Sequence, residues 1–429
     1  MRSAKMLTIT GVLAASAMTL AACAAAEPTA VEPEGPVDLR MTVWTANEDH
    51  LALFDSIAEA YMAENENVES ITFDPLPFED YTTTITTQIA GGNAPDLAWV
   101  LENAALDFVG SGALLDLAPT FEKAEGFDYD DLTDSATGLW RDGESLYAYP
   151  FSTSPMAIFS NTTLLAEAGV PSASEQVAAG DWNWEEVAAN GAAVKAATGK
   201  AGFIVRDFEY QQWDLLSTVW NGWGAQPWND ERTECTMDSD EMVDAFEFLH
   251  EAAFETGAMP GPGTTADFFA GEVAYTVTQI SRAALLGEAG FEWELHPLPA
   301  GPAGEYSVFG QAGIGVIADS PNAQAAADFL AFFTNPENSR QLAQYFPPPR
   351  ASLLTGETLA QTNPLLSAEQ LDAVVVDGIA TGVTRPTIEG SAEIQQAVRA
   401  QLDALWTPDA DIPAVLTSVC DAMQPLIQG

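Results

Sequence analysis

Basic residues are scarce in this chain of 429 residues. Lys and Arg together number 14 against 63 Asp and Glu, which gives a formal net charge of −49 at pH 7. A field of that sign repels phosphate backbones and anionic lipid headgroups. The composition therefore argues against a protein that binds nucleic acid.

Histidine and the familiar catalytic motifs are also scarce or missing. The three His residues, His50, His250 and His296, lie far apart in the sequence, which excludes a His-rich metal site and leaves few candidates for a His-based triad. The sequence has no Gly-rich phosphate loop ending in Lys-Ser/Thr, no H-E-x-x-H, no C-x-x-C and no G-x-S-x-G. Two carboxylates suffice for a glycosidase, but among 63 acids such a pair can always be imagined. We therefore expect no catalytic residue, no metal and no cofactor.

Apolar residues are plentiful. They make up 47% of the chain, with 10% aromatics, which is ample for large cores. At roughly 150 residues per domain, the length suggests two or three folding units.

The first 36 residues read as a leader and a tether. Arg2 and Lys5 precede an uncharged apolar run, 6–22, that is short and rich in Ala and Thr, as in a secretory signal. The run ends Leu20-Ala21-Ala22-Cys23, which resembles the bacterial lipobox, where cleavage precedes the Cys and the Cys receives a lipid. The alternative is an ordinary signal with an incidental Cys. Residues 23–36 are small, Pro-rich and acidic, so we expect a flexible tether and a protein exported and held by its lipid at the outer face of a membrane.

Two further cysteines, Cys235 and Cys420, follow the lipobox Cys. Disulfides persist in the compartments that exported proteins enter. We predict one bridge between these two residues; the alternative is two separately buried thiols.

The rest of the chain alternates strands with helices. Residues 39–45, 96–101, 201–205, 273–278 and 314–318 have the composition or the period-two alternation of strands. Helical spacing of apolar residues covers 54–62, 242–253, 325–333, 394–405 and 414–426. This alternation predicts an α/β fold with mostly parallel sheets.

Several segments, in this order, resemble the extracellular solute-binding proteins of ABC importers, specifically the carbohydrate-binding family that includes maltose-binding protein. The segments are Val43-Trp44-Thr45-Ala46-Asn47, Gly91-Gly92-Asn93-Ala94-Pro95-Asp96-Leu97, Leu114-Leu115-Asp116-Leu117, Tyr147-Ala148-Tyr149-Pro150-Phe151, Phe159-Ser160-Asn161, Trp182-Asn183-Trp184-Glu185-Glu186, Phe269-Ala270-Gly271-Glu272-Val273-Ala274-Tyr275, Pro297-Leu298-Pro299, Gly310 to Ala318, Ser320-Pro321-Asn322 and Ala326-Ala327-Asp328-Phe329-Leu330. Each is weak alone, but together they span almost all of the chain after the leader.

The resemblance implies a class II periplasmic-binding-protein-like fold, in which two α/β lobes joined by hinge crossovers close over a ligand. By this comparison the first lobe takes residues 37–149 and 295–342, and the second takes 150–294 and 343–429. The family has no catalytic residues. It implies a monomer whose partners are a small sugar and the transmembrane subunits of a permease.

A sugar site combines aromatic rings, which pack on C–H faces, with carboxylates and amides, which pair with hydroxyls. In the first lobe, polar or aromatic residues follow the ends of strands, where α/β folds bind ligands, or lie at the lobe junction. These candidates are Trp44, Asn47, Glu48, Glu102, Asn103, Gly310 and Gln311. For Trp44, core packing is an equal alternative, and Asp96 is expected to be a structural acceptor.

In the second lobe the candidates are Ser154, Tyr210, Gln211, Trp213, Trp223, Gln279 and Arg282. Residues 213–223 also fit an amphipathic helix that carries Trp213 and Trp220 into the core. For Arg282 the alternative is a surface salt bridge. Where maltose-binding protein has a Trp, this chain has Ser281, which puts a maltose-like ligand in doubt.

The ligand class is left open at this point. A mono- or oligosaccharide leads. A polyamine, a glycerophosphodiester or an organic acid fits the same fold, although a phosphate would require several cations near the site. A secreted carbohydrate-active enzyme is an alternative of another class.

Overall fold

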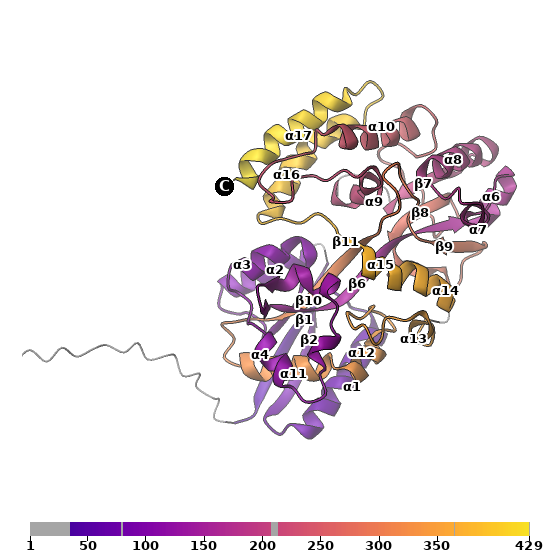
Figure 1. Cartoon of the computed structure of the whole chain (residues 1–429). Helices are drawn as coiled ribbons and strands as arrows, with labels where there is room; N and C mark the ends of the chain where they lie inside the picture. The colour runs from indigo at the N-terminus through magenta and orange to yellow at the C-terminus, as the bar shows by residue number, and fades with distance from the viewer. Residues whose placement is uncertain (1–34, 79, 207–212, 364, 429) are drawn as a thin grey trace, which may run out of the picture. The chain divides into compact units, whose positions relative to one another are not determined.

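One continuous sheet runs through both halves of the molecule. The computed structural model describes residues 35–78, 80–206, 213–363 and 365–428. Within them, nine strands form this sheet in the order β2-β1-β3-β10-β6-β8-β7, with β11 paired to β10 and β9 to β6 (Figure 1). The strands are β1 Val37–Val43, β2 Val68–Pro75, β3 Leu97–Leu101, β6 Ala148–Asn161, β7 Ala201–Val205, β8 Val273–Gln279, β9 Trp293–His296, β10 Val308–Val316 and β11 Val383–Thr384. A small hairpin, β4 Arg141–Asp142 and β5 Ser145–Leu146, lies apart.

Helices alternate with these strands along the chain. The α-helices are α1 Glu48–Glu64, α2 Tyr81–Ala90, α3 Ala105–Gly110, α4 Ala118–Lys123, α5 Asp134–Thr137, α6 Thr162–Ala168, α7 Ala173–Ala179, α8 Trp184–Thr198, α9 Ser217–Trp220, α10 Asp240–Phe254, α11 Ala323–Phe333, α12 Pro336–Leu342, α13 Gly356–Ala360, α14 Ala368–Leu371, α15 Asp377–Thr381, α16 Ser391–Leu402 and α17 Ile412–Ile427. Short 3₁₀ turns η1 Glu102–Ala104, η5 Trp213–Leu216 and η7 Ile280–Leu286, and a π-helical turn η8 Asp372–Val376, border the site described below; a further 3₁₀ turn is η6 Asn221–Trp223. The α/β fold that the sequence predicts is confirmed, but the expectation of mostly parallel sheets is wrong: β10 pairs antiparallel with β3 and β6, and β6 pairs antiparallel with β8 and β9, because β6 and β10 cross between the lobes.

Local sequence explains the first elements well. In β1, Val37, Leu39, Met41 and Val43 are buried, as the alternation predicts. Helix α1 begins after Asn47, whose Oδ1 accepts hydrogen bonds from the backbone N–H groups of the first turn. Its buried face carries Phe54, Ile57, Ala58 and Tyr61 at helical spacing.

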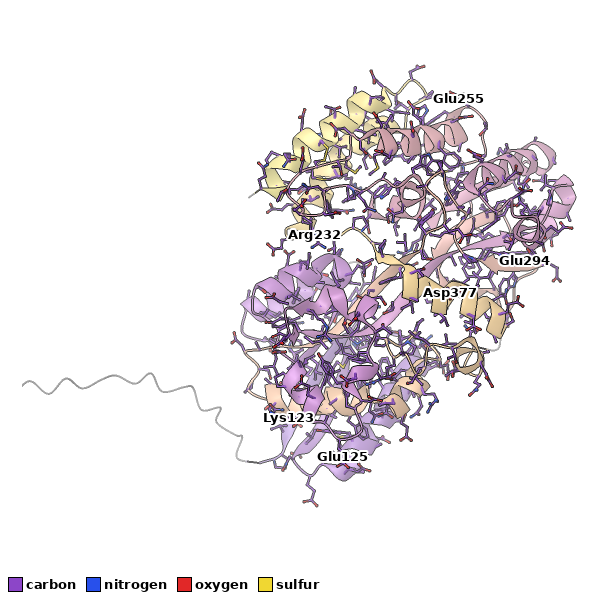
Figure 2. All side chains as sticks on the ribbon, viewed as in Figure 1. Lys123, Glu125, Arg232, Glu255, Glu294 and Asp377 are labelled. Carbon is purple, nitrogen blue, oxygen red and sulfur yellow. A yellow bond between two sulfur atoms is a disulfide. The ribbon has the colours of Figure 1, made fainter. Side chains whose placement is uncertain are left out.

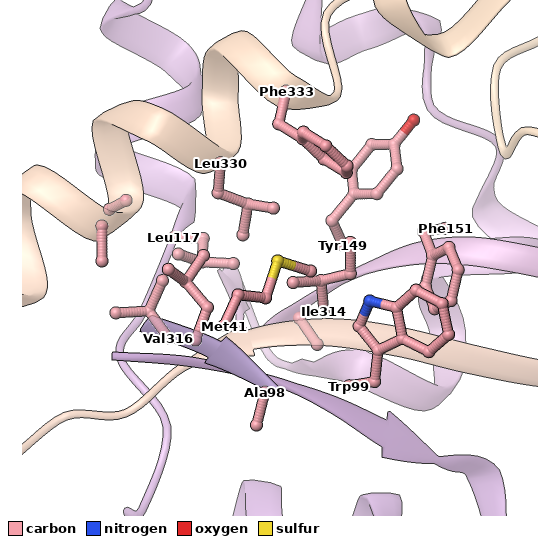
Figure 3. Close-up of a cluster of buried hydrophobic side chains, with 14 of the residues drawn as sticks. Met41, Ala98, Trp99, Leu117, Tyr149, Phe151, Ile314, Val316, Leu330 and Phe333 are labelled. Atoms are coloured by element: carbon pink, nitrogen blue, oxygen red, sulfur yellow. The ribbon is translucent and has the colours of Figure 1, made fainter. Parts of the chain in front are cut away.

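The first lobe has its own hydrophobic core, drawn from residues 37–151 and 312–342. Figure 3 shows its centre, where Met41 lies against Leu117 and Val316 from other parts of the chain and Leu330 of α11 covers them. Trp99 and Phe151 pack with ring centroids 4.4 Å apart. Burial of these large side chains holds β1, β3 and β10 together.

The second lobe is built on two further clusters. One draws on residues 156–308 and 388–423, and the other on 157–295 and 343–379. The long strand β6 joins the lobes, because its first part pairs with β10 and its last part with β8 and β9. Figure 1 shows β6 passing from the lobe that carries α1 and α11 into the lobe that carries α6 and α8.

Across the described residues, no helix is both long and apolar enough to span a bilayer. The same part of the chain holds no cluster of three or more His, Cys, Asp or Glu arranged to bind a metal ion.

Candidate functional site

The floor of the candidate site is the stretch where β6 and β10 pair between the lobes. Ser154 of β6 lies directly opposite Gly310 of β10. Ser154 is 7% exposed, and no group in the described part of the chain hydrogen-bonds its Oγ. A buried hydroxyl without a partner is costly unless a ligand or water completes it. Ser154 Oγ is therefore a free polar atom on this floor.

Arg385 lies above this floor and links the two lobes. One of its Nη atoms contacts the carboxylate of Glu102, which begins η1 after β3 in the first lobe. The other Nη donates to Asp214 Oδ2 of the second lobe at 3.0 Å. A Cβ added to Gly310 would lie 3.6 Å from Glu102 Oε1 and 3.7 Å from Arg385 Nε, which are ordinary contact distances, so Gly310 lies directly beneath this ion pair.

Burial has a measurable effect on Arg385. It lowers the pKa of the guanidinium to about 10, because the charged form loses solvation. At neutral pH the group is still protonated. Two carboxylates around one buried guanidinium leave the cluster with one net negative charge.

A pocket of about 320 Å³ opens beside this ion pair; we call it the Asn103 pocket. It lies between the lobes, since residues of η1, α2 and α3 face residues of η5 and the segment 386–395. Its lining comprises Thr82, Thr83, Asn103, Ala104, Asp107, Trp213, Asp214, Trp228, Pro386, Ile388, Ser391, Ala392, Ile394 and Gln395. Amides, hydroxyls and carboxylates therefore lie next to two indole rings.

Trp213 belongs to this pocket although little of it is exposed. It is 3% exposed and lies roughly parallel to Trp220, with ring centroids 5.7 Å apart. Trp228 meets it edge-on at 6.1 Å. Trp213 thus packs in the core of the second lobe, as one interpretation predicted, and it also borders the pocket, while contact with a ligand stays a prediction.

A second pocket, of about 550 Å³, also lies between the lobes; we call it the Trp44 pocket. Its lining comprises Trp44, His50, Ser152, Ile280, Ser281, Ala284, Ala343, Gln344, Tyr345, Phe346, Pro347, Leu359, Thr362, Asn363, Leu365, Leu371 and Val375. Trp44 is half-buried and packs against Trp99 at 4.5 Å between ring centroids. Trp44 thus packs on the core, as one alternative predicted, and it also lines a pocket, while contact with a ligand stays a prediction.

His50 lies in the Trp44 pocket against the rings of Tyr345 and Phe346, at 4.2 Å and 5.2 Å between centroids. Its Nδ1 is 3.0 Å from Thr45 Oγ1. Burial lowers the pKa of the imidazole, and the nearby Asp49 carboxylate opposes this only in part.

The described chain thus forms two lobes with ligand-sized pockets between them. Residues 56–368 match the family described as bacterial extracellular solute-binding protein. The chain belongs to this family.

The curated relatives add little detail. The first of them, from Brucella abortus and Brucella suis and named only as binding proteins, are 25% identical over 168 residues. That match covers 38% of this solute-binding protein and 37% of theirs. An uncharacterised lipoprotein of Streptomyces antibioticus is 23% identical over 359 residues, or 78% of this chain and 74% of its own.

Solved structures match nearly the whole fold. The cyclic α-maltosyl-1,6-maltose binding protein of Arthrobacter globiformis has a TM-score of 0.77 at 19% identity, covering 92% of this chain and 100% of its own. An ABC substrate-binding protein of Listeria monocytogenes in complex with cycloalternan has a TM-score of 0.77 at 22% identity, covering 92% and 99%. UgpB of Mycobacterium tuberculosis with glycerophosphocholine has a TM-score of 0.75 at 19% identity, covering 92% and 98%. At these identities the likeness shows the fold.

Several residues proposed from the sequence have other roles in this solute-binding protein. Gln311 turns away from the floor: its Oε1 accepts from Trp140 Nε1 at 2.8 Å, and its Nε2 donates to Ala136 O and Thr153 Oγ1. Because all of these partners are buried protein groups, the structure does not support Gln311 as a ligand contact.

Trp223 and Arg282 also lie elsewhere. Trp223 packs on Phe248 of α10 at 4.9 Å between ring centroids and lines a pocket between α8 and α10, away from the lobe junction. The Arg282 guanidinium lies over the ring of Phe269 at 4.6 Å, a cation–π contact that neither alternative anticipated. The structure supports neither as a ligand contact.

Some of the remaining candidates lie away from the site, and others come together in it. Asn47 caps α1 and Glu48 is exposed in its first turn. Gln279 ends β8 and is half-buried, with its Oε1 3.3 Å from Thr278 Oγ1. Glu102, Asn103, Ser154 and Gly310 come together at the floor or in the Asn103 pocket. Tyr210, Gln211 and Cys23, with the predicted leader, lie outside the described residues.

Sequence reasoning missed Arg385 and Asp214. The scarcity of cations directed attention to Arg282, but the same argument applies to Arg385 in Thr384-Arg385-Pro386. No local pattern marks Arg385, since its partners come from distant parts of the chain.

Cys235 and Cys420 are joined in the structure, with an S–S distance of 2.09 Å. The bond ties the loop after Trp228 to α17. Next to it, Gln424 of α17 accepts from the backbone N–H of Cys235 and donates to Thr233 O, each at 2.8 Å.

Proposed function

We propose that this protein is a lipoprotein receptor of an ABC importer, which captures a neutral sugar between its lobes and delivers it unchanged to a membrane permease. The observation that carries the proposal is the lobe junction, where the Glu102–Arg385–Asp214 ion pairs lie over Gly310, opposite the buried and unpartnered Ser154 Oγ, and border a pocket lined by Trp213 and Trp228. Hydroxyl-rich ligands require such fixed acceptors and donors next to aromatic rings.

The family and the similar structures support this proposal. Two of the solved structures named above bear the names of oligosaccharide ligands in their titles. The proposed anchor rests on Leu20-Ala21-Ala22-Cys23 and is supported by the Streptomyces relative, which is named a lipoprotein.

A phosphate-bearing ligand fits the site less well. UgpB with glycerophosphocholine shares the fold. In the described lining of the Asn103 pocket there is no Lys or Arg, and the adjacent Arg385 is already paired with two carboxylates. A phosphate group would have to compete with both.

Thermal-shift and calorimetric screening against neutral sugars, glycerophosphodiesters and polyamines tests the proposal. We expect only neutral sugars to stabilise the protein, and chromatography of the recovered sugar to show no turnover. X-ray scattering is expected to show a smaller radius of gyration with the sugar bound. Stabilisation by a polyamine or a phosphodiester alone, or hydrolysis of a glycan, would contradict the proposal.

Ser154→Ala gives a sharp test of the floor. Loss of one hydrogen bond costs about 1 kcal/mol, which lowers affinity about fivefold. Ser160→Ala is the matched control, because Ser160 lies on the same strand and also has a buried Oγ without a partner in the described chain, but it pairs with β8 and β9 away from the floor. Equal effects of the two substitutions would remove Ser154 from the site.

A further inference from the structure

We propose that the Trp44 pocket binds an apolar or aromatic group attached to the sugar, so that the ligand of this receptor is a glycoside with an apolar substituent. The inference rests on the proposed function, because it assigns the sugar to the floor at Ser154 and Arg385. It assigns a different chemistry to the second, larger pocket.

Three polar side chains of the Trp44 pocket, those of His50, Gln344 and Thr362, are hydrogen-bonded within the protein. His50 Nδ1 is bonded to Thr45 Oγ1. Gln344 Nε2 donates to Tyr345 Oη at 2.8 Å, and Thr362 Oγ1 donates to Leu359 O at 3.0 Å. None of the described residues that line this pocket is Asp, Glu, Lys or Arg, although such residues form 18% of the chain. A sugar placed here would find no charged partner and only the Ser152, Ser281 and Asn363 side chains to replace its hydrogen bonds with water.

Part of the apolar lining is exposed to solvent. Trp44 and Phe346 are half-buried in the wall and Leu365 at its edge is 40% exposed, whereas Ile280, Leu371 and Val375 are 4% exposed or less. Covering such surface with an apolar group is favourable, at roughly 25 cal/mol per Å² of apolar area removed from water. The lining therefore favours an alkyl or aryl group.

The polar floor and the apolar Trp44 pocket are both bordered by residues of strand β6. Ser152 lines the Trp44 pocket, and Ser154 lies on the floor beneath Arg385. The pairing of β6 with β10 is regular from Ser152 to Ser154, so the two side chains point to the same face. Two residues of strand span about 7 Å. One molecule can therefore place a sugar over Ser154 and its substituent beside Ser152.

The small side chain of Ser281 accounts for some of the volume of the Trp44 pocket. Ser281 is exposed and lines the Trp44 pocket. A small side chain here leaves room that an indole would occupy. The volume of about 550 Å³ exceeds that of the Asn103 pocket, about 320 Å³.

The experiment compares each free sugar with its 4-nitrophenyl glycoside by isothermal titration calorimetry on the full soluble chain. We expect the glycoside of the recognised sugar to bind about tenfold more tightly, because the aryl group buries apolar area. The Leu365→Ser and Ser281→Trp substitutions should each reduce this gain severalfold while leaving the affinity for the free sugar unchanged.

Leu285→Ser is the matched control. Leu285 is 56% exposed and lies on η7 beside the pocket, but it is not part of its lining. This variant should retain the full gain.

The outcomes separate this inference from the proposed function. Binding of sugars with no gain for any 4-nitrophenyl glycoside overturns the inference and leaves the proposed function standing. A gain that survives both Leu365→Ser and Ser281→Trp also overturns it, since the aryl group then binds elsewhere. If neither sugars nor glycosides bind, the proposed function itself fails.

Discussion

At the scale of single residues, Arg385 supplies the positive charge above the floor of the site. It is buried, and its partners Glu102 and Asp214 belong to different lobes. A buried charge left without its partner is strongly destabilising. We therefore expect Arg385→Ala to lower the free energy of unfolding by about 3 kcal/mol or more, as measured by urea denaturation.

Arg385→Lys should recover part of that stability, because a single ammonium can satisfy one of the two carboxylates. Arg232→Ala is the control: Arg232 is exposed, is labelled in Figure 2, and should change stability by no more than about 0.5 kcal/mol. Equal effects at Arg385 and Arg232 would contradict the buried ion pair.

The lowered pKa of His50 predicts that the free energy of unfolding depends on pH. Its pKa is lowered in the folded state, so the unfolded chain binds a proton at this residue more readily. The contribution of His50 to stability is complete above its unfolded pKa, about 6.5, and is lost as the pH falls through the lower folded value.

We therefore expect His50→Gln to lose less stability than the parent protein between pH 7 and pH 5. Denaturant titrations at both values measure the difference between the two proteins, in which the contribution of the many carboxylates cancels. An identical loss in both proteins would show that His50 is not buried in its neutral form.

At the scale of elements, the bond between Cys235 and Cys420 joins α17 to the loop that follows Trp228. The two residues are 185 positions apart, so the bond restricts a long loop in the unfolded chain. We expect a reductant, or the double substitution Cys235→Ser with Cys420→Ser, to lower the free energy of unfolding by about 4 kcal/mol.

Chemical denaturation with and without dithiothreitol measures this loss. The double-Ser variant is the control, because the reductant should leave its stability unchanged. Two alkylatable thiols in the unreduced protein would contradict the bond.

At the scale of the whole molecule, the net charge of −49 opposes folding through repulsion between carboxylates. Exposed acids are spread over several elements, as the labelled Glu125, Glu255 and Asp377 show in Figure 2. The Debye length falls from about 10 Å at 0.1 M salt to about 3 Å at 1 M, so added salt weakens this repulsion.

We therefore expect the melting temperature to rise between 0.05 M and 1 M NaCl, as measured by calorimetry. Choline chloride at the same ionic strength should act similarly, because screening does not depend on the identity of the cation. A melting temperature that falls with both salts would contradict a dominant role for repulsion.

The sequence by itself determined what depends on neighbours along the chain. Alternation places β1, and helical spacing gives the buried face of α1. Asp96 is the structural acceptor that was expected, although its donor, the backbone N–H of Arg40 at 2.8 Å, lies 56 residues away. The ordered segments also identified the family, which the match over residues 56–368 confirms. These features are set by short-range periodicity and turn chemistry, which a sequence shows directly.

Only the tertiary structure decided which side chains meet. Gln311 and Gly310 are neighbours in β10, yet alternation turns one to the buried side against Trp140 and the other to the floor beneath Arg385. Arg385 meets Asp214 across 171 residues of sequence. Such meetings depend on strand register and on how two lobes pack, and no local pattern encodes either.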